Sequence, residues 1–153
     1  MKKSNLLIIV MVFISLSCTQ KTVLSEEEKK AVETEIHQFM DSVFIAFESL
    51  TPERVYNYFL QTDEFAVASR GNLITNPSAI LDTMKVHMAI MKTQTGKTVA
   101  EKIFIINKDA AVISISRIGT ITFKNDIQID MPYALTMLLV KREGKWKITH
   151  YHN

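Results

Sequence analysis

Two histidines and a tryptophan alternate along the last predicted strand of this sequence, in the stretch Met131–His152. Trp146, His150 and His152 lie an even number of residues apart, and in a β-strand such residues point to the same face. The intervening positions carry two lysines, so that other face should be solvated. An indole and two imidazoles on the inner face predict one wall of a ligand pocket.

A lone arginine provides a second candidate for chemistry. Arg117 alternates with isoleucines on an earlier predicted strand, which predicts an inward guanidinium. A buried guanidinium is costly unless it is paired. Its partner could be an internal carboxylate, which would make it a core ion pair, or a bound anion. Tyr133 and His150 are the expected second donors, and protonation of His150 would then tighten anion binding below about pH 6.5.

A catalytic pair is harder to find. General acid–base chemistry in such a pocket would need a carboxylate beside a histidine or tyrosine. The acids near the predicted pocket fall in a loop, on the polar side of a helix, or on the outward register of a strand: Asp63, Glu64, Asp82 and Asp130. We therefore predict no catalytic residue. The predicted ligand-binding set is Arg117, His150, His152, Tyr133, His87 and Trp146.

The histidines also have simpler interpretations. His87 falls on the apolar side of its predicted helix, where a satisfied, partly buried histidine is common. His150 and His152 could donate hydrogen bonds to the backbone. The three could bind a metal, but two of them are only two residues apart on a strand and the third lacks supporting acids. We predict neither a metal nor another cofactor.

Helical spacing predicts the elements that come first. Ser25-Glu26-Glu27-Glu28 resembles a capping box, and the apolar stripe that follows predicts a long amphipathic helix to about Leu50. His37 and Asp41 lie four apart near the edge of this stripe and form a predicted solvated pair. Shorter helices should begin at Pro52 and Pro77, the second running to about Lys92. A short hairpin is predicted between them, from residues 65–69 and 73–75.

Alternation replaces helical spacing from Thr98 onward. Strands are predicted at residues 99–106, 110–123, 127–141 and 145–152, with Gly144 in the last turn. This order of elements predicts an α+β fold in which three helices pack on one face of a curved antiparallel sheet. Residues 25–153 would form one domain. Residues 134–140 are apolar on both faces of their strand except at Thr136, so the face without helices predicts a homodimer.

The N-terminus predicts export. Lys2 and Lys3 precede an apolar run that is too short to cross a bilayer and that ends just before Cys18, the only cysteine. This arrangement resembles a bacterial lipoprotein signal peptide over residues 1–17, with Cys18 lipidated and residues 18–24 as a tether. A plain secretory peptide is the alternative. The protein would then be anchored by lipid to the cell envelope.

The charge balance argues against nucleic acid as a partner. Of 153 residues, 18 are basic and 16 acidic, and removing Lys2 and Lys3 leaves 16 of each. A neutral chain without a basic cluster is a poor nucleic-acid binder. A single cysteine also excludes an intrachain disulfide and any zinc site with several cysteines.

Two segments carry a family resemblance. Gly144-Lys145-Trp146 with Thr149-His150-Tyr151-His152, and the strand from Ala110 to Arg117, resemble the nuclear transport factor 2-like superfamily. The nearest branches are the SnoaL-like domains and the association domain of calcium/calmodulin-dependent kinase II. The resemblance implies a cone-shaped, cystatin-like fold, a pocket between helices and sheet, and a dimer. Met137 stands where the kinase domain has a second pocket arginine.

Two functions remain open at this point. The first is a non-catalytic, lipid-anchored domain that binds either a small ligand or a partner segment. The more specific version of this hypothesis is a ligand that bears a carboxylate. The second is a SnoaL-like isomerase, cyclase or hydrolase of a small organic molecule. An inward acid hydrogen-bonded to His87 or His150 would favour the enzyme.

Overall fold

The computed structural model describes residues 23–153. The predicted signal peptide, Cys18 and most of the tether lie outside the described residues. Nine elements follow one another in the order helix, helix, two strands, helix, four strands. The predicted α+β fold is confirmed. Within residues 23–153, no helix combines the length and the apolar character that a membrane span requires.

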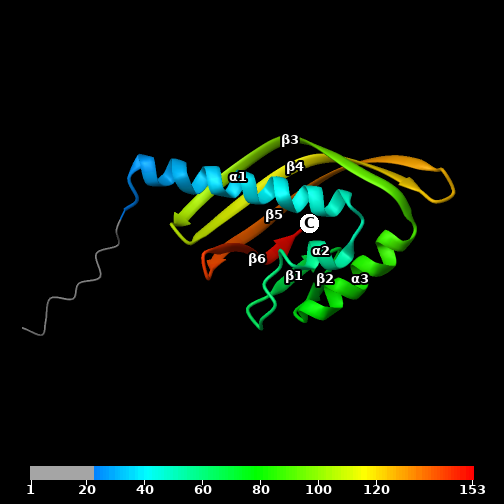
Figure 1. The fold of residues 1–153 in the computed structure, drawn as a ribbon, viewed down its shortest axis with the longest axis horizontal. Helices are drawn as coiled ribbons and strands as arrows, with labels where there is room; N and C mark the ends of the chain where they lie inside the picture. Colours follow the sequence, from blue (N-terminus) through cyan, green and yellow to red (C-terminus); the bar gives the residue numbers. More distant parts are fainter. Residues whose placement is uncertain (1–22) are drawn as a thin grey trace, which may run out of the picture.

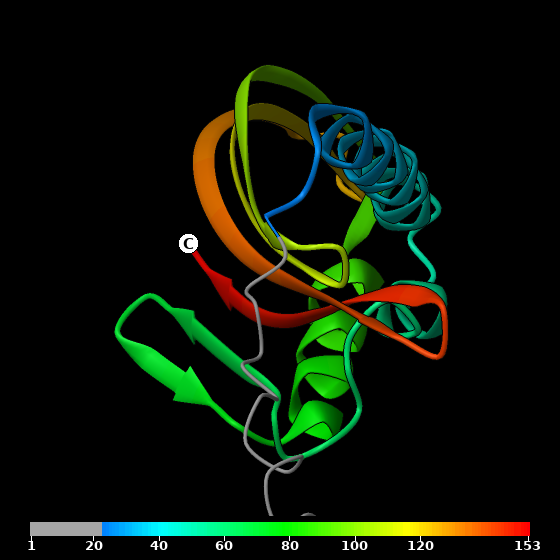
Figure 2. The same cartoon turned by 90° about the vertical axis from the view of Figure 1, so that its left-hand side faces the viewer.

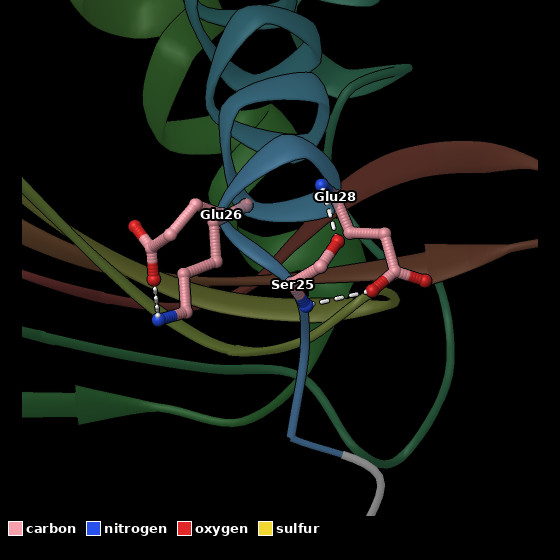
Figure 3. Close-up of polar contacts among 4 residues, drawn as sticks. Ser25, Glu26 and Glu28 are labelled. Carbon is pink, nitrogen blue, oxygen red and sulfur yellow. Dashed lines mark hydrogen bonds and ion pairs between the residues drawn. The ribbon is translucent and has the colours of Figure 1, made fainter.

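The long helix α1 runs from Glu26 to Glu48 and begins as its sequence predicts. The Ser25 hydroxyl accepts a hydrogen bond from the Glu28 backbone N–H at 3.2 Å, and the Glu28 carboxylate accepts one from the Ser25 N–H at 2.8 Å (Figure 3). This capping box satisfies donors that the first helical turn leaves free. The buried stripe of α1 comprises Val32, Ile36, Met40, Val43 and Ala46.

Short elements connect α1 to the main sheet. Helix α2 spans Pro52–Tyr56, strands β1 (Ala66–Ser69) and β2 (Asn72–Ile74) form the predicted antiparallel hairpin, and α3 spans Pro77–Ala89. Asn76 caps α3 by accepting a hydrogen bond from the Ser78 N–H. This part of the chain closes one end of the sheet.

Four long strands complete the fold: β3 (Met91–Asn107), β4 (Ala110–Phe123), β5 (Gln128–Arg142) and β6 (Lys145–His152). The sheet order is β2-β1-β6-β5-β4-β3, and only β1 and β6 pair in parallel. Strand β3 begins eight residues before the predicted start at Val99. Its first part is polar and gives no apolar alternation, but pairing with β4, interrupted by register shifts near Met91 and Thr98, holds it in the sheet.

The sheet curves around α1, which lies along its concave face (Figures 1 and 2). The two shorter helices lie toward the β1–β6 end of the sheet. The core forms between the helices and the inner side chains of β4, β5 and β6, with Phe65, Ile36, Ile113, Leu139 and Ile148 among its largest fully buried members. The opposite, outer face of the sheet carries no helix in either view.

A β-bulge interrupts β6 and changes which side chains face inward. Ile148 pairs with Leu139 but His150 pairs with Leu138, so Thr149 is an extra residue. The buried Thr149 hydroxyl donates a 2.8 Å hydrogen bond to the Glu64 carbonyl oxygen. Beyond such a bulge the alternation of side chains reverses. The prediction that both histidines share the inner face with Trp146 is therefore wrong.

Candidate functional site

A cleft of about 500 Å³ lies between the C-terminal half of α1 and the facing parts of β3 and β4. Eight residues line it: Asp41, Phe44, Ile45 and Glu48 from α1, Gly96, Lys97 and Thr98 from β3, and Arg117 from β4. The α1 residues recur at intervals of three and four, so they share one helix face. Arg117 is the only member of the predicted ligand-binding set among them.

Arg117 is buried, with 5% of its surface exposed. Its Nη1 donates a 3.1 Å hydrogen bond to the Thr98 hydroxyl, and its guanidinium carbon lies 3.4 Å from the centroid of the Phe44 ring. Among the described residues, its Nε is a buried nitrogen without a hydrogen-bond partner, and no carboxylate lies within ion-pair distance. The Nε N–H of the guanidinium is therefore a buried donor that still lacks an acceptor.

Gly96 makes room for this guanidinium. A Cβ atom at position 96 would lie 2.8 Å from Nη2 of Arg117, closer than real side chains pack. Gly96 pairs with Gly119 on β4, two residues beyond Arg117. The missing side chain at position 96 thus allows the guanidinium to lie against the strand on one side and against Phe44 on the other.

Two tyrosines lie on the inner face of the sheet, and one of them, Tyr133, lies beside Arg117. Tyr133 pairs with Arg117 across β4 and β5 and is half-buried. Burial raises the pKa of Tyr133, and the positive charge of Arg117 opposes this effect. Burial, followed by the neighbouring Tyr133, raises the pKa of Tyr151 to about 12. Both hydroxyls are therefore protonated donors at neutral pH.

The predicted histidines lie elsewhere. His150 and His152 pair with Leu138 and Thr136 of β5, on the outer register. His150 on β6 lies two strand spacings from Arg117 on β4 and five residues further along β5, or roughly 20 Å by ordinary sheet spacings. The two cannot form one end of a pocket. His87 is exposed, because the buried side of α3 is formed by Met84 and Met88.

Trp146 is buried but has a structural partner. Its Nε1 donates a 2.9 Å hydrogen bond to the Glu35 carboxylate on α1, and Lys141 forms an ion pair with the same carboxylate. The Lys141 ammonium also lies 5.0 Å from the centre of the indole ring. Trp146 thus joins the β5–β6 hairpin to α1.

The predicted solvated pair of His37 and Asp41 is not the contact that His37 makes. His37 Nδ1 lies 3.1 Å from the Glu101 carboxylate on β3, and Asp41 instead lines the cleft. Among residues 23–153, no group of three or more His, Cys, Asp or Glu side chains is placed to hold a metal ion. The described site thus consists of a buried cation, an aromatic face and carboxylates at the rim.

Sequence reasoning missed most of the cleft. Phe44, Asp41 and Glu48 belong to the predicted long helix, but its periodicity does not reveal which strand faces them. Gly96 and Thr98 precede the predicted strand start. Strict alternation along residues 145–152 predicts an outward Tyr151, because the bulge at Thr149 leaves no mark in the sequence pattern.

Comparison with known proteins places this geometry in context. Residues 36–153 match the family model of the SnoaL-like domain. No curated protein matches the chain. Solved structures match it over most of its length.

A nuclear transport factor 2-like superfamily protein from Salmonella enterica superposes with a TM-score of 0.73 at 18% identity, covering 81% of this chain and 90% of its own. A Xanthomonas campestris protein, provisionally assigned as a calcium/calmodulin dependent protein kinase II association domain, gives 0.68 at 19% identity, with coverage of 77% and 83%. The hexachlorocyclohexane dehydrochlorinase LinA-type3 of Novosphingobium barchaimii gives 0.68 at 14%, with coverage of 84% and 88%. At these identities the likeness concerns the fold, and it confirms the predicted superfamily resemblance.

Proposed function

Because the chain belongs to the SnoaL-like domain family, we propose that it binds a small carboxylate-bearing molecule in the cleft between α1, β3 and β4, without transforming it. The observation that carries this proposal is the state of Arg117. Its guanidinium is buried, lines the cleft and lacks a carboxylate partner among the described residues. A carboxylate ligand would supply the missing acceptors, and arginine holds carboxylates through two parallel hydrogen bonds.

The position of the histidines supports binding over catalysis. Neither His87 nor His150 has a side-chain hydrogen bond or ion pair with an acid of the described residues. A proton-transfer enzyme would need such a pair at its pocket. No histidine lines the cleft, so protonation of His150 cannot tighten anion binding there as predicted. We expect affinity to stay constant between pH 6 and pH 8.

We also propose that the domain is lipid-anchored at Cys18 and works as a homodimer on the cell envelope. The anchor rests on the sequence before the described residues. The dimer rests on the outer face of the sheet, where Phe104, Val112 and Leu138 pair side by side across β3, β4 and β5. Phe104 is 54% exposed, and Figure 2 shows no helix over the outer face of the sheet. A second copy would remove it from water.

Thermal unfolding in the presence of small carboxylates tests the binding proposal. Acetate, propanoate and pentanoate should raise the Tm of the full chain, and the alcohols of the same length should not. Arg117→Gln should abolish the response, whereas Arg142→Gln, a surface arginine paired with Glu64, should keep it. NMR spectra of the ligand should be unchanged after incubation. This control is needed because structural neighbours such as the hexachlorocyclohexane dehydrochlorinases bear the names of enzymes. Conversion of the ligand would favour the enzymatic alternative.

A further inference from the structure

The charges around the cleft are not balanced within the protein. Asp41 and Glu48 line the cleft beside Arg117, yet among the described residues none of the three takes part in an ion pair within 4.0 Å. Acids elsewhere on the described surface do form such pairs: Glu26, Glu35, Glu53, Glu64, Glu101 and Asp126. Among the described residues, other exposed acids such as Glu33 are also unpaired, so Asp41 and Glu48 are distinguished by lining the cleft beside a buried guanidinium.

Helix geometry places both acids close to the arginine. Phe44, whose ring covers the guanidinium, lies three residues after Asp41 and four before Glu48 on the same helix face. At about 1.5 Å per residue, the acids lie about 4.5 Å and about 6 Å from Phe44 along the helix axis, on opposite sides. A ligand carboxylate held by Arg117 would therefore have an acidic side chain to either side.

Lys97 does not neutralise these acids. It pairs with Ile118 on β4, the exposed residue between the inward Arg117 and Gly119. Paired residues point to the same face of a sheet, so the Lys97 ammonium points to the outer face and its backbone lines the cleft. The inner charges are then one buried cation and two carboxylates.

We propose that the ligand of this cleft is an amino carboxylic acid, which carries an ammonium a few carbons from its carboxylate. Its carboxylate binds Arg117 and its ammonium lies against Asp41 or Glu48, on one side of that carboxylate. A simple carboxylate would be repelled by both acids, whereas a ligand with both charges matches the cation and the acids together. This inference rests on the proposed function and names its ligand class.

Calorimetric titration of the full chain with matched ligands tests the inference. The pairs are propanoate against β-alanine and pentanoate against 5-aminopentanoate, with propylamine as the amine alone. The amino acid of at least one pair should bind about fivefold tighter than its carboxylate, the ratio expected for a partly exposed ion pair. Propylamine should bind more weakly than either member of its pair.

The double variant Asp41→Asn/Glu48→Gln should lose this preference and bind propanoate more tightly than the wild type does. Glu33→Gln, an exposed acid of α1 outside the cleft lining, is the matched control and should keep the preference. If carboxylates bind at least as tightly as their amino acids, the inference fails and the proposed function stands. If neither the simple carboxylates nor the amino acids bind, the inference and the proposed function both fail.

Discussion

The guanidinium carbon of Arg117 lies 3.4 Å from the centroid of the Phe44 ring, so that a strand of the sheet and the long helix meet through one cation–π contact. Such contacts stabilise by about 0.5–2 kcal/mol, more when water is excluded. The ring covers one face of the guanidinium, and among the described residues its Nε N–H has no hydrogen-bond acceptor. Helix α1 is therefore both a wall of the cleft and the support of its central cation.

Gly96→Ala should displace this cation. The new Cβ would lie 2.8 Å from Nη2 of Arg117, and the Phe44 ring prevents an easy retreat. The backbone at Gly96 has no positive φ, so the fold should survive. We expect carboxylate affinity to fall about tenfold, which is about 1.4 kcal/mol. Calorimetric titration measures this affinity, and Thr95→Ala on the same strand is the control variant. Unchanged affinity would remove Gly96 from the site.

Glu35→Gln should lower stability at neutral pH but not in acid. The hydrogen bond from Lys141, followed by that from Trp146, holds the pKa of Glu35 below its usual value of 4.5. A lowered folded-state pKa means stability that is present above about pH 4.5 and lost as pH falls through the folded pKa. Because Glu35 is half exposed, the loss at pH 7 should be only about 0.5 kcal/mol.

Urea unfolding at pH 7 and pH 3 measures this difference. Glu33→Gln, an exposed acid on the same helix beyond its first turn, is the control and should have no effect at either pH. An equal loss of unfolding free energy at pH 7 and pH 3 would show that the charge of Glu35 does not contribute to stability.

Cys18 should carry a lipid. Cells that express the full chain and receive radiolabelled palmitate should label the protein, because the cysteine directly follows the apolar run of the signal segment. Cys18→Ala should remove the label. A wild-type protein that is exported but unlabelled would favour the plain secretory peptide.

Residues 25–153 should form a dimer. Light scattering should give about twice the monomer mass, because the Phe104 row on the outer face would otherwise stay in water. Phe104→Glu should give a folded monomer, since Phe104 is already 54% exposed in the single chain. Val86→Glu on α3, where the side chain is 68% exposed, should leave the dimer intact. A wild-type monomer at micromolar concentration would contradict the proposal.

The fold was largely predictable from the sequence because it rests on periodicity. The capping box at Ser25 and the alternation of β4 and β5 each appear in the structure as predicted. The predicted turn at Gly144 also appears in the structure, where Glu143 and Gly144 both have positive φ. These signals are local, so neighbouring residues suffice to read them.

The candidate site was less predictable because it depends on contacts between distant segments. Arg117 was found, since a cation among isoleucines stands out in a strand. Its contact with Phe44 spans 73 positions of the chain and leaves no local pattern. The bulge at Thr149 arises where β6 meets both β1 and the segment before it, and one extra residue was enough to turn both histidines outward.

The central claim is that Arg117 holds a carboxylate ligand, and calorimetric titration of the wild type and Arg117→Gln with β-alanine and propanoate tests it most directly. We predict saturable binding of one equivalent to the wild type at both pH 6 and pH 8. The Arg117→Gln variant should show no measurable binding, and Arg142→Gln should match the wild type. Equal binding by the wild type and Arg117→Gln, or binding by neither, would contradict the account.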